Sequence, residues 1–281
     1  MRDIYAETTN SIIKSIEDNP GEVILPWQRN GSSGLPVNID TDNSYRGVNI
    51  VMLWCAIEER KYSSNTFGTY KQWRKKDCQV RKGEKASPII FYKELFVEED
   101  GKQKKIPMLR SSTVFNADQV DGYEPPNIED HGPVDRIKTA DAFVERTKAT
   151  ILHGGSAAYY HRKRDDITMP DEQRFFDTQT ATRTESYYST LLHELTHWSG
   201  AEHRLNREKG KCFGDDKYAF EELIAELGAA FLCAKLTIEK EPRTDHAAYI
   251  ANWLEALKGD KKFIFSAAAR AQDAMDYLCE L

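Results

Sequence analysis

The sequence lacks any apolar run close to the ~18 residues that cross a membrane, which argues against a membrane-spanning helix. Its first ten residues hold no apolar stretch behind a basic start, so no secretory signal is predicted. Cysteine is scarce and forms no Cys-x-x-Cys pair, which argues against a disulfide framework and a thiolate metal site. The five cysteines are Cys55, Cys78, Cys212, Cys233 and Cys279. We expect a reduced, cytoplasmic protein with no membrane partner.

Repeats and low-complexity segments are also missing, as are the clustered carboxylates of a two-metal nuclease. Hydrophobic residues make up 40% of the 281 positions and charged residues 30%, which is typical of globular domains. Residues 121–136 read DGYEPPNIEDHGPVDR, a stretch rich in proline and polar residues and therefore typical of a linker. We predict two domains, over residues 1–126 and 137–281, with a linker over 127–136.

Hydrophobic spacing predicts an α+β fold. The N-terminal half is expected to be α+β, and the C-terminal half mainly helical with a small sheet. In the N-terminal half we predict helices over residues 4–16, 48–57 and 69–73, the last capped by Thr69, and a hairpin of strands over 89–97 and 106–115. In the C-terminal half we predict strands over 157–160 and 166–169, and helices over 140–150, 185–199, 220–236, 247–257 and 267–278.

Residues 193–197 read His-Glu-Leu-Thr-His inside one predicted helix. At 100° per residue, His197 lies about 40° and Glu194 about 100° from His193, so the three share one arc. Two imidazoles at this spacing can bind one metal ion, and the glutamate between them can reach a water molecule there. We predict a zinc site with His193 and His197 as ligands and Glu194 as the catalytic acid/base. The alternative is a solvated helix face, although the apolar residues lie on the opposite arc: Tyr187, Tyr188, Leu191, Leu192, Leu195 and Trp198.

A catalytic zinc ion needs a third protein ligand and an open position. The next predicted helix offers Glu222 and Glu226 on one stripe. Their Glu-x-x-Ala-Glu arrangement resembles the second motif of gluzincin-like metallopeptidases, in which the first acid binds metal and the second bonds a ligand histidine. The resemblance implies Glu222 as the third ligand and Glu226 as its support. Two alternatives stay open: the glutamates are ordinary surface charges, or His203, which is in register with the metzincin pattern, is the third ligand.

The N-terminal half carries a basic stretch, residues 60–85, with nine Lys or Arg and two acids, although the chain has a net charge of −6. Residues 1–127 hold 18 basic and 18 acidic side chains, so the acidic excess lies wholly after them. Aromatic residues interleave with these cations, as in proteins that bind single strands, where cations follow phosphates and rings stack on bases. The alternative is that the aromatics belong to the core and the charges to a solvated face.

Several motifs follow one another along nearly the whole chain. In the N-terminal half they are Pro26-Trp27, Tyr45-Arg46-Gly47-Val48-Asn49, Thr69-Tyr70-Lys71-Gln72 and Val80-Arg81-Lys82-Gly83-Glu84-Lys85. In the C-terminal half they are Asp166-Ile167-Thr168-Met169-Pro170, His193-Glu194-Leu195-Thr196-His197-Trp198, Arg204-Leu205-Asn206-Arg207, Tyr218 through Leu232, and Asn252-Trp253-Leu254. Together they resemble the ArdC-type antirestriction proteins of plasmids and mobile elements.

The resemblance implies an N-terminal domain that binds single-stranded DNA, joined to a zincin-like metallopeptidase domain, and a role in protecting incoming DNA from host restriction. The chemistry expected is zinc-assisted hydrolysis of a peptide bond in an unknown protein substrate, with Glu194 moving the proton. The alternative is a non-catalytic DNA-binding protector whose zinc site is structural. The candidate DNA contacts are Arg46, Lys71, Trp73, Arg74, Arg81, Lys82 and Lys85.

Overall fold

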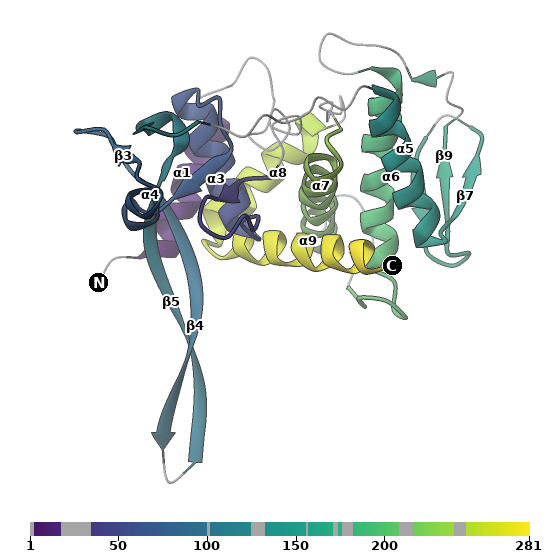
Figure 1. Cartoon of the computed structure of the whole chain (residues 1–281). Helices are drawn as coiled ribbons and strands as arrows, with labels where there is room; N and C mark the ends of the chain where they lie inside the picture. Colours follow the sequence, from purple (N-terminus) through teal and green to yellow (C-terminus); the bar gives the residue numbers. More distant parts are fainter. Residues whose placement is uncertain are drawn as a thin grey trace.

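The computed structural model describes residues 3–17, 35–99, 102–124, 133–155, 157–170, 174–175, 182–207, 216–238 and 246–281. The fold is α+β and is built from two domains, as expected (Figure 1). Helices dominate the C-terminal domain, and the strands form small sheets in both domains. No helix among the described residues is long and apolar enough to cross a membrane.

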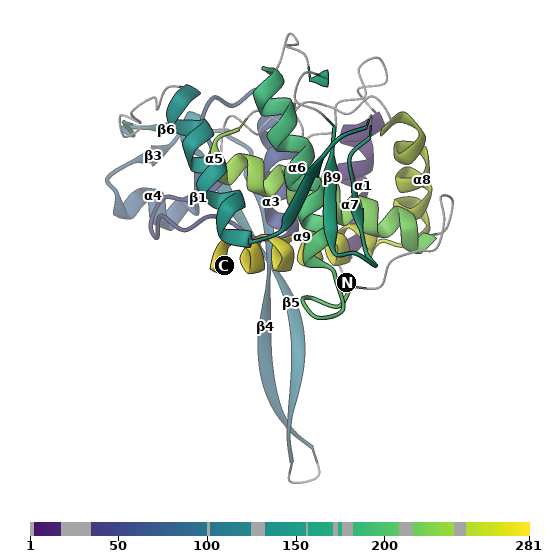
Figure 2. The same cartoon turned by 90° about the vertical axis from the view of Figure 1, so that its right-hand side faces the viewer.

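In the described residues of the N-terminal domain, helices accompany a four-stranded sheet in the order β1-β2-β5-β4. The helices are α1 (Ile4–Glu17), α3 (Val48–Arg60) and α4 (Tyr70–Lys75). The strands are β1 (Val37–Asn38), β2 (Thr66–Gly68), β4 (Ser87–Glu99) and β5 (Lys102–Asn116). The last two form the predicted hairpin, longer than expected, which projects from the body of the molecule in both views (Figures 1 and 2).

A second, two-stranded sheet lies beside α4. The 3₁₀ turn Ala117–Gln119 leads from β5 into β6 (Val120–Asp121), which pairs antiparallel with β3 (Gln79–Val80). The predicted cap of α4 is confirmed: the Thr69 hydroxyl accepts from the backbone N–H of Gln72, whose side chain accepts from the backbone N–H of Thr69. This cap fixes where α4 begins in the basic stretch.

The C-terminal domain places helices beside a three-stranded sheet in the order β7-β9-β8. The strands are β7 (Thr150–His153), β8 (Tyr159–His161) and β9 (Asp166–Met169). The helices are α5 (Pro133–Thr147), α6 (Arg183–Ser199), α7 (Asp216–Leu236), α8 (His246–Gly259) and α9 (Phe263–Glu280).

The region between the domains differs from the sequence prediction at its C-terminal end. Proline is favoured in the first turn of a helix, and α5 begins at Pro133, so residues 133–136 are helical rather than linker. The helix ends at Thr147, and Lys148 adopts a left-handed conformation with φ of 54°. Strand β7 begins at Thr150, the residue at which the helix was expected to end, and the sequence analysis did not predict this strand.

One hydrophobic core runs through both domains. Trp54 of α3 packs on Phe231 of α7, with ring centroids 5.8 Å apart. The turn before α3 is bonded to α9: Arg46 pairs with Asp276, and the backbone N–H of Gly47 donates to the Gln272 side chain over 3.0 Å. Helix α7 lies at the centre of the helices of this domain (Figure 1). Helix α3 of the N-terminal domain therefore packs directly against α7, the helix at the centre of the C-terminal domain.

Candidate metal centre

Helix α6 carries the His-Glu-Leu-Thr-His segment deep in the protein. Its first turn is fixed by a capping box between Thr182 and Glu185. Every residue from 191 to 200 is buried, and His193, Glu194 and His197 are only 3%, 4% and 5% exposed. The arc opposite the apolar residues is therefore covered as well, and the alternative of a solvated helix face is wrong.

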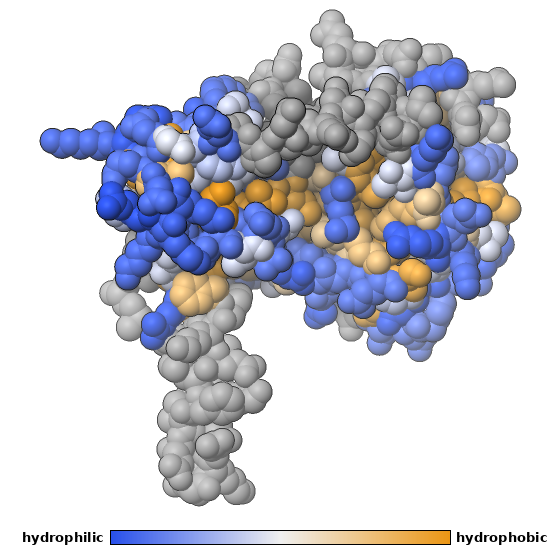
Figure 3. Space-filling view, in the orientation of Figure 1, coloured by the Kyte–Doolittle hydropathy of each residue, from blue (hydrophilic) through white to orange (hydrophobic). Residues whose placement is uncertain are grey.

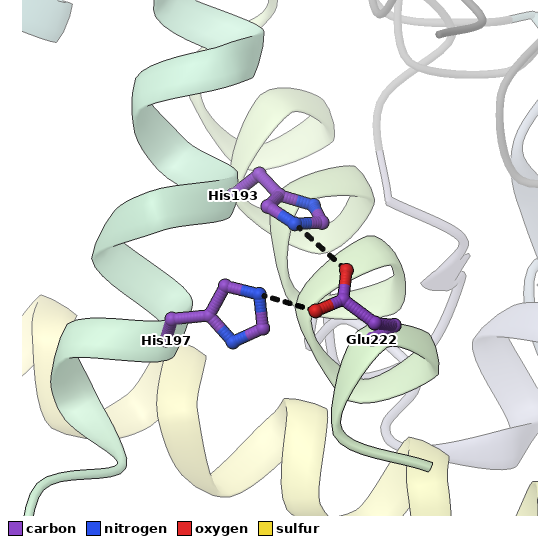
Figure 4. Close-up of side chains that lie close together, drawn as sticks. All are labelled: His193, His197 and Glu222. Carbon is purple, nitrogen blue, oxygen red and sulfur yellow. Dashed lines mark ion pairs between the residues drawn. The ribbon is translucent and has the colours of Figure 1, made fainter. Parts of the chain in front are cut away.

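Helix α7 covers that arc and contributes an acid to it. Glu222 lies between the two histidines (Figure 4), with 3.6 Å from Nε2 of His193 to one carboxylate oxygen and 3.4 Å from Nε2 of His197 to the other. One ligand atom of each of the three residues lies within 4.8 Å of the others. In a tetrahedral zinc site with bonds of about 2.0–2.1 Å, neighbouring ligand atoms are about 3.3 Å apart. The spacing and donor types therefore fit a metal ion with three protein ligands.

A second carboxylate faces the outer nitrogen of each histidine. Nδ1 of His193 lies 3.2 Å from Glu226 Oε1, and Nδ1 of His197 lies 3.2 Å from Glu221 Oε1. Carboxylates in this position fix the ring orientation and the tautomer of a metal-binding histidine. The structure places Glu226 beside His193 and Glu221 beside His197, and the sequence analysis did not predict a role for Glu221.

Glu221 is held by a buried arginine. Arg207 is 6% exposed, and its guanidinium donates to both oxygens of Glu221, over 3.0 Å and 3.2 Å. It also donates to the Ser199 hydroxyl over 2.9 Å and to the Thr196 carbonyl. Burial alone would raise the pKa of Glu221, but His197 and Arg207 outweigh it and lower the pKa to about 2. Glu221 is therefore ionised at neutral pH and ties His197 to the loop after α6.

The pKa of Glu222 is set by the same balance. Burial would raise it, but the hydrogen bonds and charges of His193 and His197 hold it far below its usual range. Glu222 is 9% exposed and Glu226 is 1% exposed, so the interpretation of both as surface charges is wrong. His203 has a side chain that is 64% exposed, pairs with Asp165 and lies outside the one cluster of candidate ligands among the described residues.

Close contact between α6 and α7 keeps the two halves of the cluster together. Thr196 is completely buried, and a side chain carbon at Gly228 would lie 2.5 Å from its Cγ2 atom. Only glycine allows this approach, because real contacts of this kind do not fall below 3.0 Å. The position of Glu222 relative to the histidines therefore depends on Gly228.

Most predicted DNA contacts belong to α4 or follow β3, at an end of the molecule where hydrophilic residues cover much of the surface (Figure 3), whereas Arg46 lies in the turn before α3 and contacts α9. Two of the arginines are exposed but already bonded: Arg46 to Asp276, and Arg81 to Glu84 and Asp121. Exposed Lys71, Arg74, Lys82 and Lys85 have no ion pair within the described residues.

Trp73 does not fit its predicted role as a DNA contact. Its ring is 0% exposed, and its indole N–H donates to the Phe115 carbonyl over 3.0 Å. Helix α4 has only six residues, and Trp73 is its one buried side chain. This ring packs in a small core with Cys78, Val80 and Val120. A buried ring of this kind has no face to offer to a base.

Two family models match the chain in succession. Residues 2–115 match the N-terminal domain of anti-restriction factor ArdC, and residues 138–270 match a zincin-like metallopeptidase domain. The stretch between the two matches contains the proline-rich segment that was predicted to separate the domains.

Relatives cover the chain almost completely. An uncharacterized protein of Sinorhizobium fredii, y4eC, is 41% identical over 98% of this chain and 91% of its own length. Two DNA primases TraC of Escherichia coli are 33% and 34% identical over 90% of this chain, which spans only 18% and 25% of their lengths.

Solved structures agree in fold over the full length. The metal-free crystal structure of the antirestriction protein ArdC from plasmid R388 superposes with a TM-score of 0.82 at 39% identity, and covers 99% of this chain and 97% of that one. The structure described as its Mn(II)-bound form superposes with a TM-score of 0.80 at 37% identity, and the match covers 99% of this chain and 98% of that one. The arrangement of both domains is therefore common to this chain and these structures.

Proposed function

Since the chain belongs to the family of ArdC-type antirestriction proteins, we propose that it protects incoming DNA of a mobile element from host restriction. The proposal has two parts: the N-terminal domain binds single-stranded DNA, and the zincin-like domain carries a catalytic zinc site. The observation that carries it is the buried cluster of His193, His197 and Glu222 between α6 and α7. The proposed division places DNA binding in residues 1–126 and the metallopeptidase domain in residues 137–281.

In the proposed site, His193, His197 and Glu222 hold the metal. The donor set of two imidazoles and one carboxylate suits zinc, and the relative from plasmid R388 has a structure described as Mn(II)-bound. A divalent ion bound there would polarise a peptide carbonyl and make water a stronger acid. Glu226 and Glu221 would hold the outer nitrogens of the two histidines, so that both rings present Nε2 to the metal.

The proposed catalytic residue is Glu194. It follows His193 on α6, about 100° further around the helix, and is 4% exposed. A carboxylate so shielded from bulk water can take a proton from the attacking water and pass it to the leaving amine. The proposed substrate is a peptide bond of a protein.

A second candidate function is that of a DNA-binding protector whose metal site is only structural. The burial of all three ligands favours it, because structural zinc sites are enclosed. Two observations favour catalysis instead: structural sites use four protein ligands where the described cluster has three, and a structural site has no use for Glu194.

DNA binding is proposed to rest on four cations that are exposed and carry no ion pair among the described residues: Lys71, Arg74, Lys82 and Lys85. They lie on or near α4 and β3, at one end of the molecule. Cations that pair with no protein acid can neutralise phosphates and release the counterions bound to DNA. This contribution to the binding free energy does not depend on the base sequence of the DNA.

Transfer of an unmodified plasmid into a restricting host tests the proposal. In the restricting host, a plasmid that encodes the wild type should be kept by more recipients than a plasmid without the protein. Transfer into a non-restricting host gives the reference number of recipients. Glu194→Gln keeps the shape of the side chain but removes the base, and should abolish the protection if the site is catalytic. If Glu194→Gln protects as well as the wild type, the structural alternative holds. If the wild type gives no protection, the antirestriction proposal is wrong for this chain.

A further inference from the structure

An exposed aromatic ring stands in the middle of the basic stretch. Tyr70, the first residue of α4, is 47% exposed, whereas Trp73 on the same helix is completely buried. It is the one large hydrophobic side chain of residues 60–85 that is so exposed, and this part of the chain is described throughout. Exposure of a ring between cations distinguishes Tyr70 from the aromatics that form the core of this domain.

An open cavity of about 520 Å³ lies against this ring. Its other walls include the apolar ring of Phe115, the cations Arg81 and Lys82, and the acids Glu84 and Asp121. The volume is in the range of sites that take small planar ligands. Residues of α4, β3 and β5 contribute to the cavity wall, and no residue of the candidate metal centre lines it.

The ring of Tyr70 is held in place by its neighbours. The Gln79 side-chain amide donates to the Tyr70 hydroxyl over 3.3 Å, and its carbonyl oxygen accepts from the Arg74 guanidinium over 2.8 Å. A ring fixed before binding loses little conformational entropy when a ligand stacks on it. Because the amide nitrogen and the carbonyl oxygen of Gln79 already form hydrogen bonds within the protein, we do not expect this residue to hydrogen-bond to a bound ligand.

Both acids of the cavity wall, Glu84 and Asp121, pair with Arg81, which leaves Lys82 as the cation of the wall without an ion pair among the described residues. Lys71, beside the tyrosine in sequence, and Lys82, in the cavity wall, have no ion pair within the described residues. Arg81 is different, because it pairs with Glu84 and Asp121 and donates to the Asp118 carbonyl. Lys82 in the wall and Lys71 next to Tyr70 in the chain are therefore available to the phosphates of a strand whose base stacks on the tyrosine.

From these observations we infer that Tyr70 is a stacking platform for one unpaired base of single-stranded DNA, and that the cavity beside it receives that base. The inference rests on the proposed DNA-binding function. It adds a reason why the protein would bind single-stranded DNA in preference to a duplex. Bases of a duplex are stacked on one another and paired, so they are not free to cover an exposed ring. Every base has a flat face, so such a platform accepts any sequence.

The experiment uses the full-length chain and two strands of equal length, an oligothymidylate and an abasic strand that keeps the phosphates but has no bases. Affinity is measured for both by fluorescence anisotropy over a series of salt concentrations. The variants are Tyr70→Ala, which removes the ring, and Tyr70→Phe, which keeps the ring but not the hydroxyl. Tyr159→Ala is the matched control, because Tyr159 is 45% exposed and belongs to β8 of the other domain.

The wild type, Tyr70→Phe and Tyr159→Ala should prefer the oligothymidylate to the abasic strand. Tyr70→Ala should bind the oligothymidylate about 5- to 150-fold more weakly, with the salt slope and the abasic affinity unchanged. The inference is overturned if Tyr70→Ala keeps the preference, or if the wild type binds both strands equally and with salt dependence, in which case DNA binding itself stands. If the wild type binds neither strand at low salt, the proposed DNA-binding function fails and the inference fails with it.

Discussion

The glutamate that supports His197 offers a sharp test of how the metal centre is built. Glu221 contacts Nδ1 of His197 at 3.2 Å and accepts two hydrogen bonds from Arg207. Glu221→Gln keeps the size of the side chain but removes its charge. The change should weaken metal binding by about 10- to 100-fold, because loss of a carboxylate that orients a metal-binding histidine typically lowers metal affinity by that factor. That factor corresponds to about 1.4–2.7 kcal/mol of binding free energy.

The same change should also lower the stability of the protein. Arg207 is 6% exposed and would lose its only carboxylate partner among the described residues, keeping the Ser199 hydroxyl and the Thr196 carbonyl. Breaking one side of a buried ion pair costs about 3–5 kcal/mol. The remaining bonds to Arg207 place the expected loss at the lower end of that range.

Metal affinity is measured by competition with a chelator, at a temperature where thermal melting shows the variant to be folded. Glu185→Gln serves as the control, since Glu185 lies on the same helix but belongs to the cap at its first turn. Glu221→Gln should lose affinity and Glu185→Gln should not. A folded Glu221→Gln protein with wild-type affinity would refute the reasoning that His197 is oriented from Glu221.

Three further predictions follow from the same structure. Glu222→Ala should lower metal affinity much more than His203→Ala in the same chelator assay, because His203 lies outside the cluster; the reverse order would move the third ligand to His203. Gly228→Ala should destabilise the protein by about 1–3 kcal/mol in urea unfolding and weaken metal binding, because its side chain carbon would meet Thr196 at 2.5 Å; an unchanged unfolding midpoint would contradict the close packing of α6 and α7. Replacing four exposed cations by alanine should weaken binding to single-stranded DNA and flatten the log–log salt slope by up to about 3, at about 0.7 per phosphate contact; an unchanged slope would show that the phosphates lie elsewhere. The four cations are Lys71, Arg74, Lys82 and Lys85.

Local patterns in the sequence predicted the elements that carry the candidate site. The spacing of His193 and His197 requires only a regular helix, and the same periodicity placed Glu222 and Glu226 on one stripe of the next helix. The Thr69 cap and the β4–β5 hairpin were predicted from short-range signals of the same kind. Contacts that depend only on helical or strand period are encoded within a few residues.

Contacts between distant segments escaped the sequence analysis. Arg207 reaches Glu221 from the loop after α6, and no periodic pattern relates the two positions. Glu221 directly precedes Glu222 in the sequence, but nothing in that position marked it as the partner of His197. Trp73 and Tyr70 show the same limit, because composition marked both as aromatics among cations and only the packing of α4 decided which ring is exposed.

The shared core also affects how DNA binding is tested. A fragment ending near residue 126 would lose the contacts of Trp54 with Phe231 and of Arg46 with Asp276, so it would expose apolar surface of α1 and α3. All binding experiments are therefore best made with the full chain. The charge asymmetry between the halves still predicts that single-stranded DNA binds to the N-terminal half. It does not predict that the N-terminal half folds alone.

The central claim is that His193, His197 and Glu222 hold one divalent metal ion. The most direct test is elemental analysis of the purified protein beside the double variant His193→Ala/His197→Ala, with circular dichroism to show that both are folded. We predict about one zinc ion per wild-type chain and none above background in the variant. A folded double variant that retains one metal ion per chain would place the ion elsewhere and contradict the claim.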